Sequence, residues 1–222
     1  KSRPLPVRKP QDEPVQTGVR RVTVKAPAEL PVLVMGYRAP LIRDVEKDVD
    51  PYALEMLGAV LSGHGAARFS KHLVREQRLA VSAGAEYDST ARGPGMFYLV
   101  GMPSEGRSVA EMEAGLRAEI VRVQGEGVSA EELDRAKAQL VAGEIYKLDS
   151  MFAQAMEIGQ LESTGLPYAS GERMIERLKT VTAEQVQDVA RRYFSDDALT
   201  VGVLDPQPMS ATPRRPQAVP RH

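Results

Sequence analysis

The stretch Leu61–Asp88, LSGHGAARFSKHLVREQRLAVSAGAEYD, joins three patterns in one continuous segment. Small residues near its start predict a turn. The basic segment from about Ala66 to Gln77 places Phe69 and Leu73 one helical turn apart, which predicts an amphipathic helix. From Leu79 to Asp88, two sets of residues alternate, as they do along a strand with one buried face. A turn, a helix and a strand in immediate succession indicate a fold that mixes both element types.

The rest of the chain also alternates between helical spacing of its apolar residues and the two-residue alternation of strands. Asp50 followed by Pro51 predicts an N-cap with proline at the first helical position, and this helix ends at Gly63. Capping boxes, in which Ser or Thr precedes Glu or Gln by three residues, predict further helix starts at Ser108, Ser129 and Thr182. Alternation or compact apolar runs predict strands at Val19–Lys25, Val32–Tyr37, Leu79–Asp88, Met96–Met102 and Ala198–Leu204.

The helical segments come in runs, and the strand pairs lie close in sequence. Ser129–Ser163 is long enough for two helices or one bent helix, and Gly171–Lys179 adds a short one. We expect the following residues of the long segment to point inward: Leu133, Ala136, Leu140, Ile145 and Leu148. This order predicts an α+β fold of two layers, with a mostly antiparallel sheet and helices packed on one face, rather than a doubly wound parallel sheet.

The distribution of proline divides the chain into three predicted segments. Residues 1–18 contain four prolines among charged residues and predict an extended linker, which something could precede. Residues 206–222 contain five prolines, too many for a helix or a central strand, and predict a disordered tail. Residues 19–205 then form one α+β domain.

Composition excludes several classes of function. The 222 residues carry a formal net charge of -1, which does not favour nucleic acid or an anionic membrane. No apolar run approaches the roughly 20 residues that cross a bilayer, so we expect no membrane insertion. The chain has no cysteine, which excludes disulfides, thiolate metal sites and cysteine nucleophiles.

The residues needed for independent hydrolysis are missing from the sequence. Neither H-x-x-E-H nor H-E-x-x-H occurs, and His72 with Glu76, four apart on a predicted helix, makes only part of a metal site. No G-x-S-x-G elbow or phosphate-binding glycine loop occurs either. We therefore predict no catalytic residues and no metal ligands. Arg68, Lys71, Arg75 and Arg78 form a basic stripe that is more typical of a solvated helix face than of a carboxylate-binding site.

Several stretches between Val19 and Asp205 together resemble the C-terminal, non-catalytic domain of pitrilysin-family zinc peptidases, relatives of mitochondrial processing peptidase and insulin-degrading enzyme. They are LSGHGAARFSKHL, LVREQRLAVSAGAEYD, GPGMFYLVG, VSAEELDRAKAQL and VTAEQVQDVARRYF. The resemblance implies that two similar α+β halves enclose a chamber. It also implies that the first half holds zinc through H-x-x-E-H and a more distant glutamate, while the second half contributes substrate contacts.

The resemblance also points to particular residues. Family members often place an arginine near the end of the helix corresponding to 68–77 and a tyrosine early in the next strand, where both contact substrate. Arg75 is the nearest match for that arginine, and Arg78 is the alternative if the helix ends differently. The tyrosine position falls on Val81, so half of the pair is missing. Arg75 and Arg78 are the candidate substrate-binding residues.

Three hypotheses follow. The leading one makes this chain the non-catalytic half of a zinc-dependent endopeptidase, which closes the chamber and helps to bind a peptide while an H-x-x-E-H partner domain or subunit carries the zinc. The second is a structural or assembly subunit of the same fold that binds no peptide, as Val81 allows. The third is an independent enzyme built on His72 and Glu76. By analogy with similar two-domain bacterial proteins we expect a periplasmic location, and the cytoplasm is the alternative.

Overall fold

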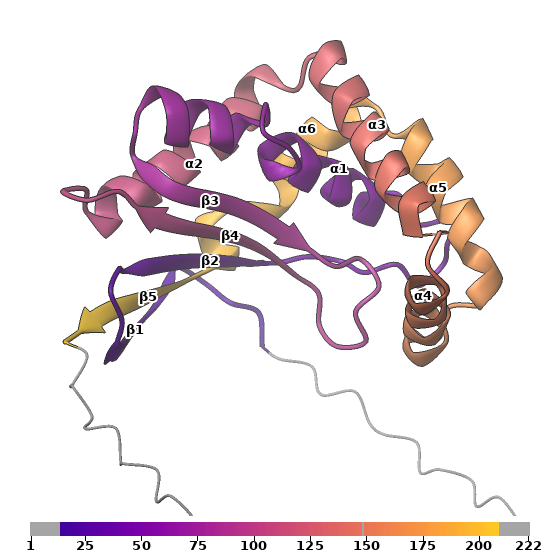
Figure 1. Ribbon diagram of the computed structural model, residues 1–222, viewed down its shortest axis with the longest axis horizontal. Helices are drawn as coiled ribbons and strands as arrows, with labels where there is room; N and C mark the ends of the chain where they lie inside the picture. The colour runs from indigo at the N-terminus through magenta and orange to yellow at the C-terminus, as the bar shows by residue number, and fades with distance from the viewer. Residues whose placement is uncertain (1–13, 148, 209–222) are drawn as a thin grey trace, which may run out of the picture.

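One open sheet organises the computed structural model, which describes residues 14–147 and 149–208 (Figure 1). Its strands are β1 (Arg20–Pro27), β2 (Val32–Arg38), β3 (Ala80–Tyr87), β4 (Met96–Pro103) and β5 (Leu199–Gln207). They lie side by side in the order β1-β5-β2-β4-β3. The pairs β5–β2, β2–β4 and β4–β3 are antiparallel, whereas β1 and β5 run parallel with Arg20 opposite Thr200. The sheet is therefore mostly antiparallel, with one parallel pair at its edge.

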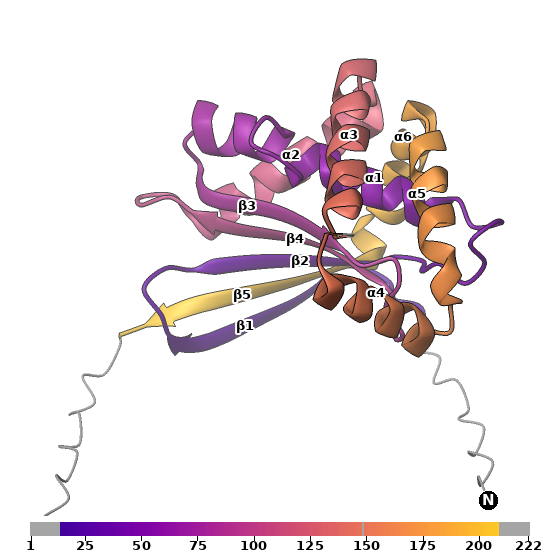
Figure 2. The ribbon, with the colours of Figure 1, turned by 45° about the vertical axis from the view of Figure 1, so that its right-hand side comes forward.

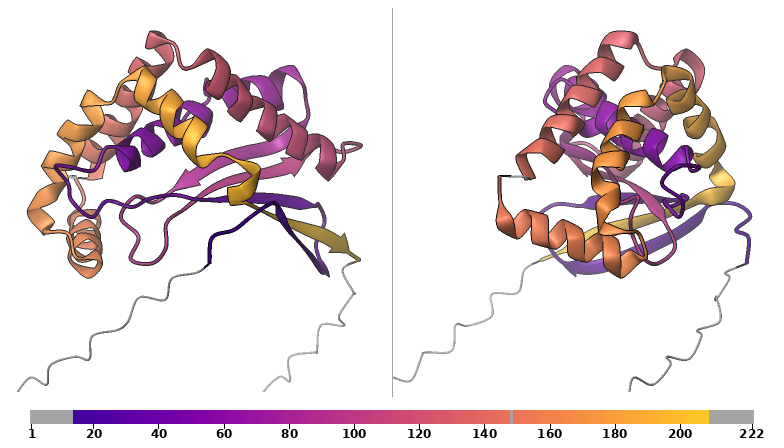
Figure 3. Two further views of the ribbon diagram at one scale, coloured as in Figure 1. Left: turned by 180° about the vertical axis from the view of Figure 1, so that it is seen from behind. Right: turned by 90° about the vertical axis from the view of Figure 1, so that its right-hand side faces the viewer.

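The helices cover one face of this sheet, as Figures 1 and 2 show. Packing of α6 against both α1 and α2 is visible from behind in Figure 3. The elements are α1 (Asp50–Ser62), the π-helix η1 (Phe69–Glu76), α2 (Val109–Glu126), α3 (Ala130–Lys147), α4 (Met151–Thr164), the short η2 (Tyr168–Ser170), α5 (Gly171–Thr180), α6 (Ala183–Tyr193) and the short η3 (Asp196–Ala198). The predicted α+β class, with a mostly antiparallel sheet and helices on one face, is confirmed.

The core lies between the sheet and the helices. Alternation along β2 directs Leu33, Met35 and Tyr37 towards the helices, and all three are buried. The ring of Tyr37 lies 4.7 Å from that of Phe194, at the end of α6, and Phe194 lies 4.9 Å from Phe97 of β4. This aromatic group joins the centre of the sheet to the end of α6.

Local signals located most of the element boundaries. In the predicted capping box of α2, the hydroxyl of Ser108 accepts the backbone N–H of Glu111 while the Glu111 carboxylate accepts the N–H of Ser108. The same reciprocal pairs occur between Ser129 and Glu132 at α3 and between Thr182 and Gln185 at α6. The predicted hairpin is formed by β3 and β4.

Two side chains depart from the predictions. Asp50 does not cap α1, because Val49 is the N-cap residue and the Asp50 carboxylate instead bonds to Arg192 at 2.7 Å and to the hydroxyl of Tyr193 at 2.5 Å. Ile145 is exposed rather than inward, whereas Glu144 and Lys147 of the same last turn of α3 line a cavity. Ser129–Ser163 forms two helices, and Leu148 lies outside the described residues.

Parts of the predicted linker and of the predicted tail belong to the folded domain. Gln16 is buried, and its amide donates to the carbonyls of Gly18 and Leu199. Strand β5 continues to Gln207, and the remaining parts of the predicted linker and tail, 1–13 and 209–222, lie outside the described residues. Within the described ranges, every helix falls short of the length and hydrophobicity that a bilayer-spanning segment requires.

Candidate functional site

The candidate arginines lie around the turn from η1 into β3. Phe69 and Leu73 are fully buried and fix η1 against the core, which leaves Arg75 exposed on the opposite side. Its Nη1 donates to the carbonyl oxygen of Gly65 at 2.7 Å. The small-residue turn before η1 therefore positions the Arg75 guanidinium, and the rest of this group faces solvent.

Arg78, two residues after the end of η1, has a left-handed backbone conformation. Its φ of 50° lies in the left-handed region, which is uncommon for a residue other than glycine. The strain is held in place by the next residue, Leu79, whose N–H donates to the carbonyl of Leu73 at 2.8 Å. Arg78 is exposed, and neither it nor Arg75 has a carboxylate partner among the described residues.

Val81 lies at an irregularity of strand β3. The β3–β4 register shifts between Ala80 and Ser82, so Val81 is the extra residue of a bulge. Its side chain is 54% exposed. The position at which the similar family has a tyrosine is therefore open to solvent on the edge strand, close in sequence to Arg75 at the end of η1 and to Arg78 in the following turn.

The basic stripe predicted on this helix is not continuous. Arg68 is buried, and its Nε and Nη2 bond to the Glu132 carboxylate at 2.8 and 3.0 Å, while Nη2 also donates to the carbonyl of Gly127. The arginine lowers the pKa of Glu132 to about 2, with its hydrogen bonds as the main cause. Arg68 thus fastens η1 to the start of α3 and is not part of a solvated face.

His72 contacts a carboxylate of α2 rather than Glu76, the residue that could share its helix face. Its Nδ1 lies 2.9 Å from Oε2 of Glu119 on α2, and Glu119 also accepts from Arg122 at 2.9 Å. Glu76, its predicted neighbour, is exposed. Glu119 is 1% exposed, and its carboxylate joins His72 of η1 to Arg122 of α2, whose side chain is 37% exposed. Among residues 14–147 and 149–208, no three His, Asp or Glu side chains are arranged to hold a metal ion.

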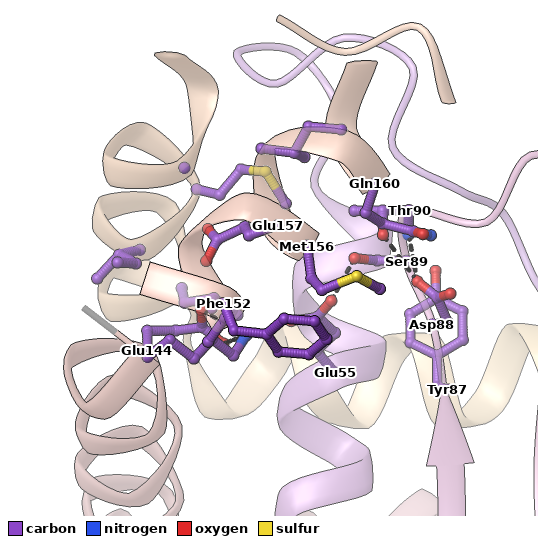
Figure 4. A pocket seen from close by; sticks show the side chains of 17 residues that line it. Glu55, Tyr87, Asp88, Ser89, Thr90, Glu144, Phe152, Met156, Glu157 and Gln160 are labelled. Carbon is purple, nitrogen blue, oxygen red and sulfur yellow. Dashed lines mark hydrogen bonds and ion pairs between the residues drawn. The ribbon is translucent and has the colours of Figure 1, made fainter. Parts of the chain in front are cut away.

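A cavity of about 580 Å³ lies at the other end of β3, where α1, α3, α4 and α5 meet the β3–β4 loop. Figure 4 shows Glu55 of α1 at its base, bonded to Ser89, with Phe152 and Met156 of α4 beside it. Burial raises the pKa of the Glu55 carboxyl to about 7. Sequence reasoning missed this residue, although a lone glutamate inside the apolar run YALEMLGAVL was a usable signal.

Comparison with known proteins gives a consistent result. Residues 1–140 match the family model of the peptidase M16 inactive domain. A curated relative from Rickettsia bellii, named an uncharacterized zinc protease, is 25% identical over 182 residues, which are 82% of this chain and 42% of that protein. The chain therefore spans less than half the length of this relative.

Solved structures share the fold. A protease from Helicobacter pylori matches with a TM-score of 0.78 and 21% identity, over 87% of this chain and 46% of that one. The inactive peptidase domain of a proposed zinc protease from Bordetella parapertussis matches with a TM-score of 0.71 and 16% identity, over 85% of this chain and 98% of that one. At these identities the likeness concerns the fold alone.

Proposed function

Because this chain belongs to the family of M16 peptidase inactive domains, we propose that it is the non-catalytic half of a zinc-dependent endopeptidase. Its partner, a domain or subunit with an H-x-x-E-H motif, carries the zinc and activates the water. This chain closes the chamber over an extended peptide. The observation that carries the proposal is the family match, which covers 140 of the 222 residues.

The turn between η1 and β3 supports a role in peptide binding. Arg75 presents a guanidinium that is fixed by one carbonyl and has no carboxylate partner among the described residues. Such a group can donate to a peptide carbonyl or a terminal carboxylate. Val81 lies on the adjacent edge strand, where an extended peptide can pair with exposed backbone groups. We assign the substrate contact to Arg75, with Arg78 as its neighbour.

Reconstitution tests this proposal. The full chain is mixed with its cognate H-x-x-E-H half, and cleavage of a fluorogenic peptide is followed. We expect kcat/KM to rise well above that of the zinc half alone, and Arg75→Gln to lower it about tenfold, the size of one lost charged hydrogen bond. No gain over the zinc half alone would sink the proposal.

Arg191→Gln is the matched control. Arg191 is also exposed, and its Nε also donates to a main-chain carbonyl, that of Gln124, at 2.7 Å. It lies on α6, away from β3. Its replacement should leave cleavage unchanged.

The alternative is an assembly subunit that binds no peptide. Val81 favours it, because the aromatic side chain expected at this position is missing. Such a subunit would bind the zinc half with normal affinity, and Arg75→Gln would leave both peptide affinity and kcat/KM unchanged. For location we propose the periplasm, by analogy with similar two-domain bacterial proteins, against the cytoplasm. Fractionation of cells that express the native gene decides between them.

A further inference from the structure

The cavity beside Glu55 has the size and walls of a binding site for a small organic molecule. Its volume of about 580 Å³ falls in the range of sites for such ligands. Apolar side chains from two helices form most of its wall, with Phe152 and Met156 on α4 and Met174 and Ile175 on α5. Phe152 is 76% exposed and Met156 is 58% exposed, so little of the α4 wall is covered by the rest of the chain.

One carboxyl group lies among these apolar side chains. The hydroxyl of Ser89 donates to Oε1 of Glu55, and Figure 4 shows the carboxyl between α1 and the side chains of α4. A carboxylate in such surroundings is destabilised by lost solvation unless a positive group lies beside it. The cation that lines the cavity is Lys147, which bonds to both oxygens of Glu144 at 2.7 Å. A proton neutralises the Glu55 carboxyl in part, and a cationic ligand would stabilise its charged form in place of that proton.

The charged groups around the cavity are unbalanced. The other charged residues that line the cavity are Asp88 at the end of β3, Glu144 and Lys147 on α3 and Glu157 on α4. Helix α5 adds only Met174, Ile175, Leu178 and Gly171. Four carboxyl groups thus surround a space with one ammonium group, which favours a cation and disfavours an anion.

We propose that this cavity binds an apolar organic cation, a hydrocarbon group that ends in one ammonium or guanidinium placed beside the Glu55 carboxylate. The apolar part contacts Phe152, Met156 and Ile175. The positive end replaces the solvation that Glu55 loses on burial. The site lies at the opposite end of β3 from Arg75 and does not depend on the proposed peptidase role.

Calorimetric titration of the full chain with 4-phenylbutylamine tests the proposal, and 4-phenylbutanol is the uncharged control ligand. Of the two protonation states of Glu55, only the charged one attracts the amine. With a pKa of about 7, that form makes up about 10% of the carboxyl at pH 6 and about 90% at pH 8. Affinity for the amine should therefore rise about ninefold from pH 6 to pH 8. The alcohol should bind more weakly at pH 8 and show no such dependence.

Variants separate a charge effect from a change of shape. Glu55→Gln keeps an acceptor for Ser89 and should lose both the tighter binding and its pH dependence. Ala153→Trp fills the cavity from the α4 wall without altering Glu55 and should abolish binding. Glu131→Gln, which removes an exposed carboxylate paired with Arg135 elsewhere on α3, should change nothing. Circular dichroism confirms that each variant is folded.

Three outcomes would overturn the proposal: equal affinity for the alcohol and the amine, unchanged pH dependence in Glu55→Gln, or full binding by Ala153→Trp. A blocked tripeptide with a central arginine, Leu-Arg-Leu, identifies the source of the cation. If it displaces the amine, the site accepts a basic side chain of a peptide. If it does not, the site is restricted to small free amines.

Discussion

The hydroxyl of Ser62 bonds to both backbone groups of Ala85. The N–H of Ala85 donates to Oγ at 2.8 Å, and Oγ lies 3.2 Å from the carbonyl oxygen to which it donates. Because Ala85 belongs to edge strand β3, these groups would otherwise be available to an added strand. Ser62, the last residue of α1, therefore closes one position of the edge that our proposed function offers to a peptide.

Replacing this serine should open that position. Ser62→Ala leaves the N–H and carbonyl of Ala85 to water, and we expect a loss of about 1 kcal/mol in the free energy of unfolding. Hydrogen exchange of the Ala85 amide, measured by NMR, should accelerate. Ser163→Ala, which removes an exposed hydroxyl bonded to Gln160 O on α4, is the control and should leave that amide unaffected. Unchanged exchange at Ala85 in Ser62→Ala would contradict the role of the hydroxyl.

The ion pair between Arg68 and Glu132 should make the free energy of unfolding depend on pH in the acid range. The pKa of Glu132 is about 2 in the folded chain and 4.5 as its ordinary value, so its stabilisation is present above about pH 4.5 and is lost as the pH falls towards 2. The shift corresponds to at most about 3 kcal/mol. We expect the free energy of unfolding, measured with urea, to fall less between pH 5 and pH 3 in Glu132→Gln than in the unmodified chain.

Glu111→Gln is the control for this measurement, because Glu111 occupies the same position of a capping box but is exposed and pairs with exposed Arg107. Its effect should be smaller, since solvent screens the pair. Equal acid sensitivity in Glu132→Gln and the unmodified chain would show that the buried pair contributes little.

Glu55 should have the opposite pH dependence. Its folded-state pKa of about 7 exceeds the ordinary value of 4.5, so the folded chain keeps this carboxyl protonated up to a higher pH than the unfolded chain does. Stability should therefore fall as the pH rises from 4.5 to 7 and level off above that, by up to about 3 kcal/mol. Glu55→Gln should remove this decline and be more stable than the unmodified chain at pH 8. Urea unfolding at pH 5 and pH 8 measures both effects, and a variant less stable at pH 8 would refute the assignment.

Helix α4 exposes apolar side chains that should promote self-association. Phe152→Ser combined with Met156→Ser removes two exposed groups and should change the free energy of unfolding by less than about 1 kcal/mol. Sedimentation velocity at several concentrations should show less association than in the unmodified chain. Leu161→Ala, which truncates the buried residue of the same helix, should cost about 2–4 kcal/mol. Equal association before and after the double replacement would exclude this face.

Short-range patterns predicted most of the fold. The capping boxes of α2, α3 and α6 and the hairpin of β3 and β4 each depend on residues close in sequence, so their positions could be read directly. The parallel contact between β1 and β5 joins the two ends of the domain, and no local signal predicts it.

At the candidate site, too, the contacts between residues far apart in sequence could not be predicted. From spacing alone, Glu76 was the residue that could share a helix face with His72, whereas the carboxylate that His72 contacts, Glu119, is 47 residues away. Arg68 was placed on a solvated face because Glu132, 64 residues away, could not be identified from spacing. Arg75 lies at the end of η1, where the resemblance suggested it, and Arg78 lies in the turn that follows; both are exposed, and their role in substrate binding stays a prediction.

The position of β5 between β1 and β2 affects how this domain can form during synthesis. Strands β2, β3 and β4 can pair early, because they follow one another at short intervals. Strand β1 has no neighbour until β5 leaves the ribosome, almost at the end of the domain. Bringing such distant segments together is slow relative to closing local hairpins. The nascent chain must therefore hold β1 unpaired, and one side of β2 open, until translation has passed Gln207.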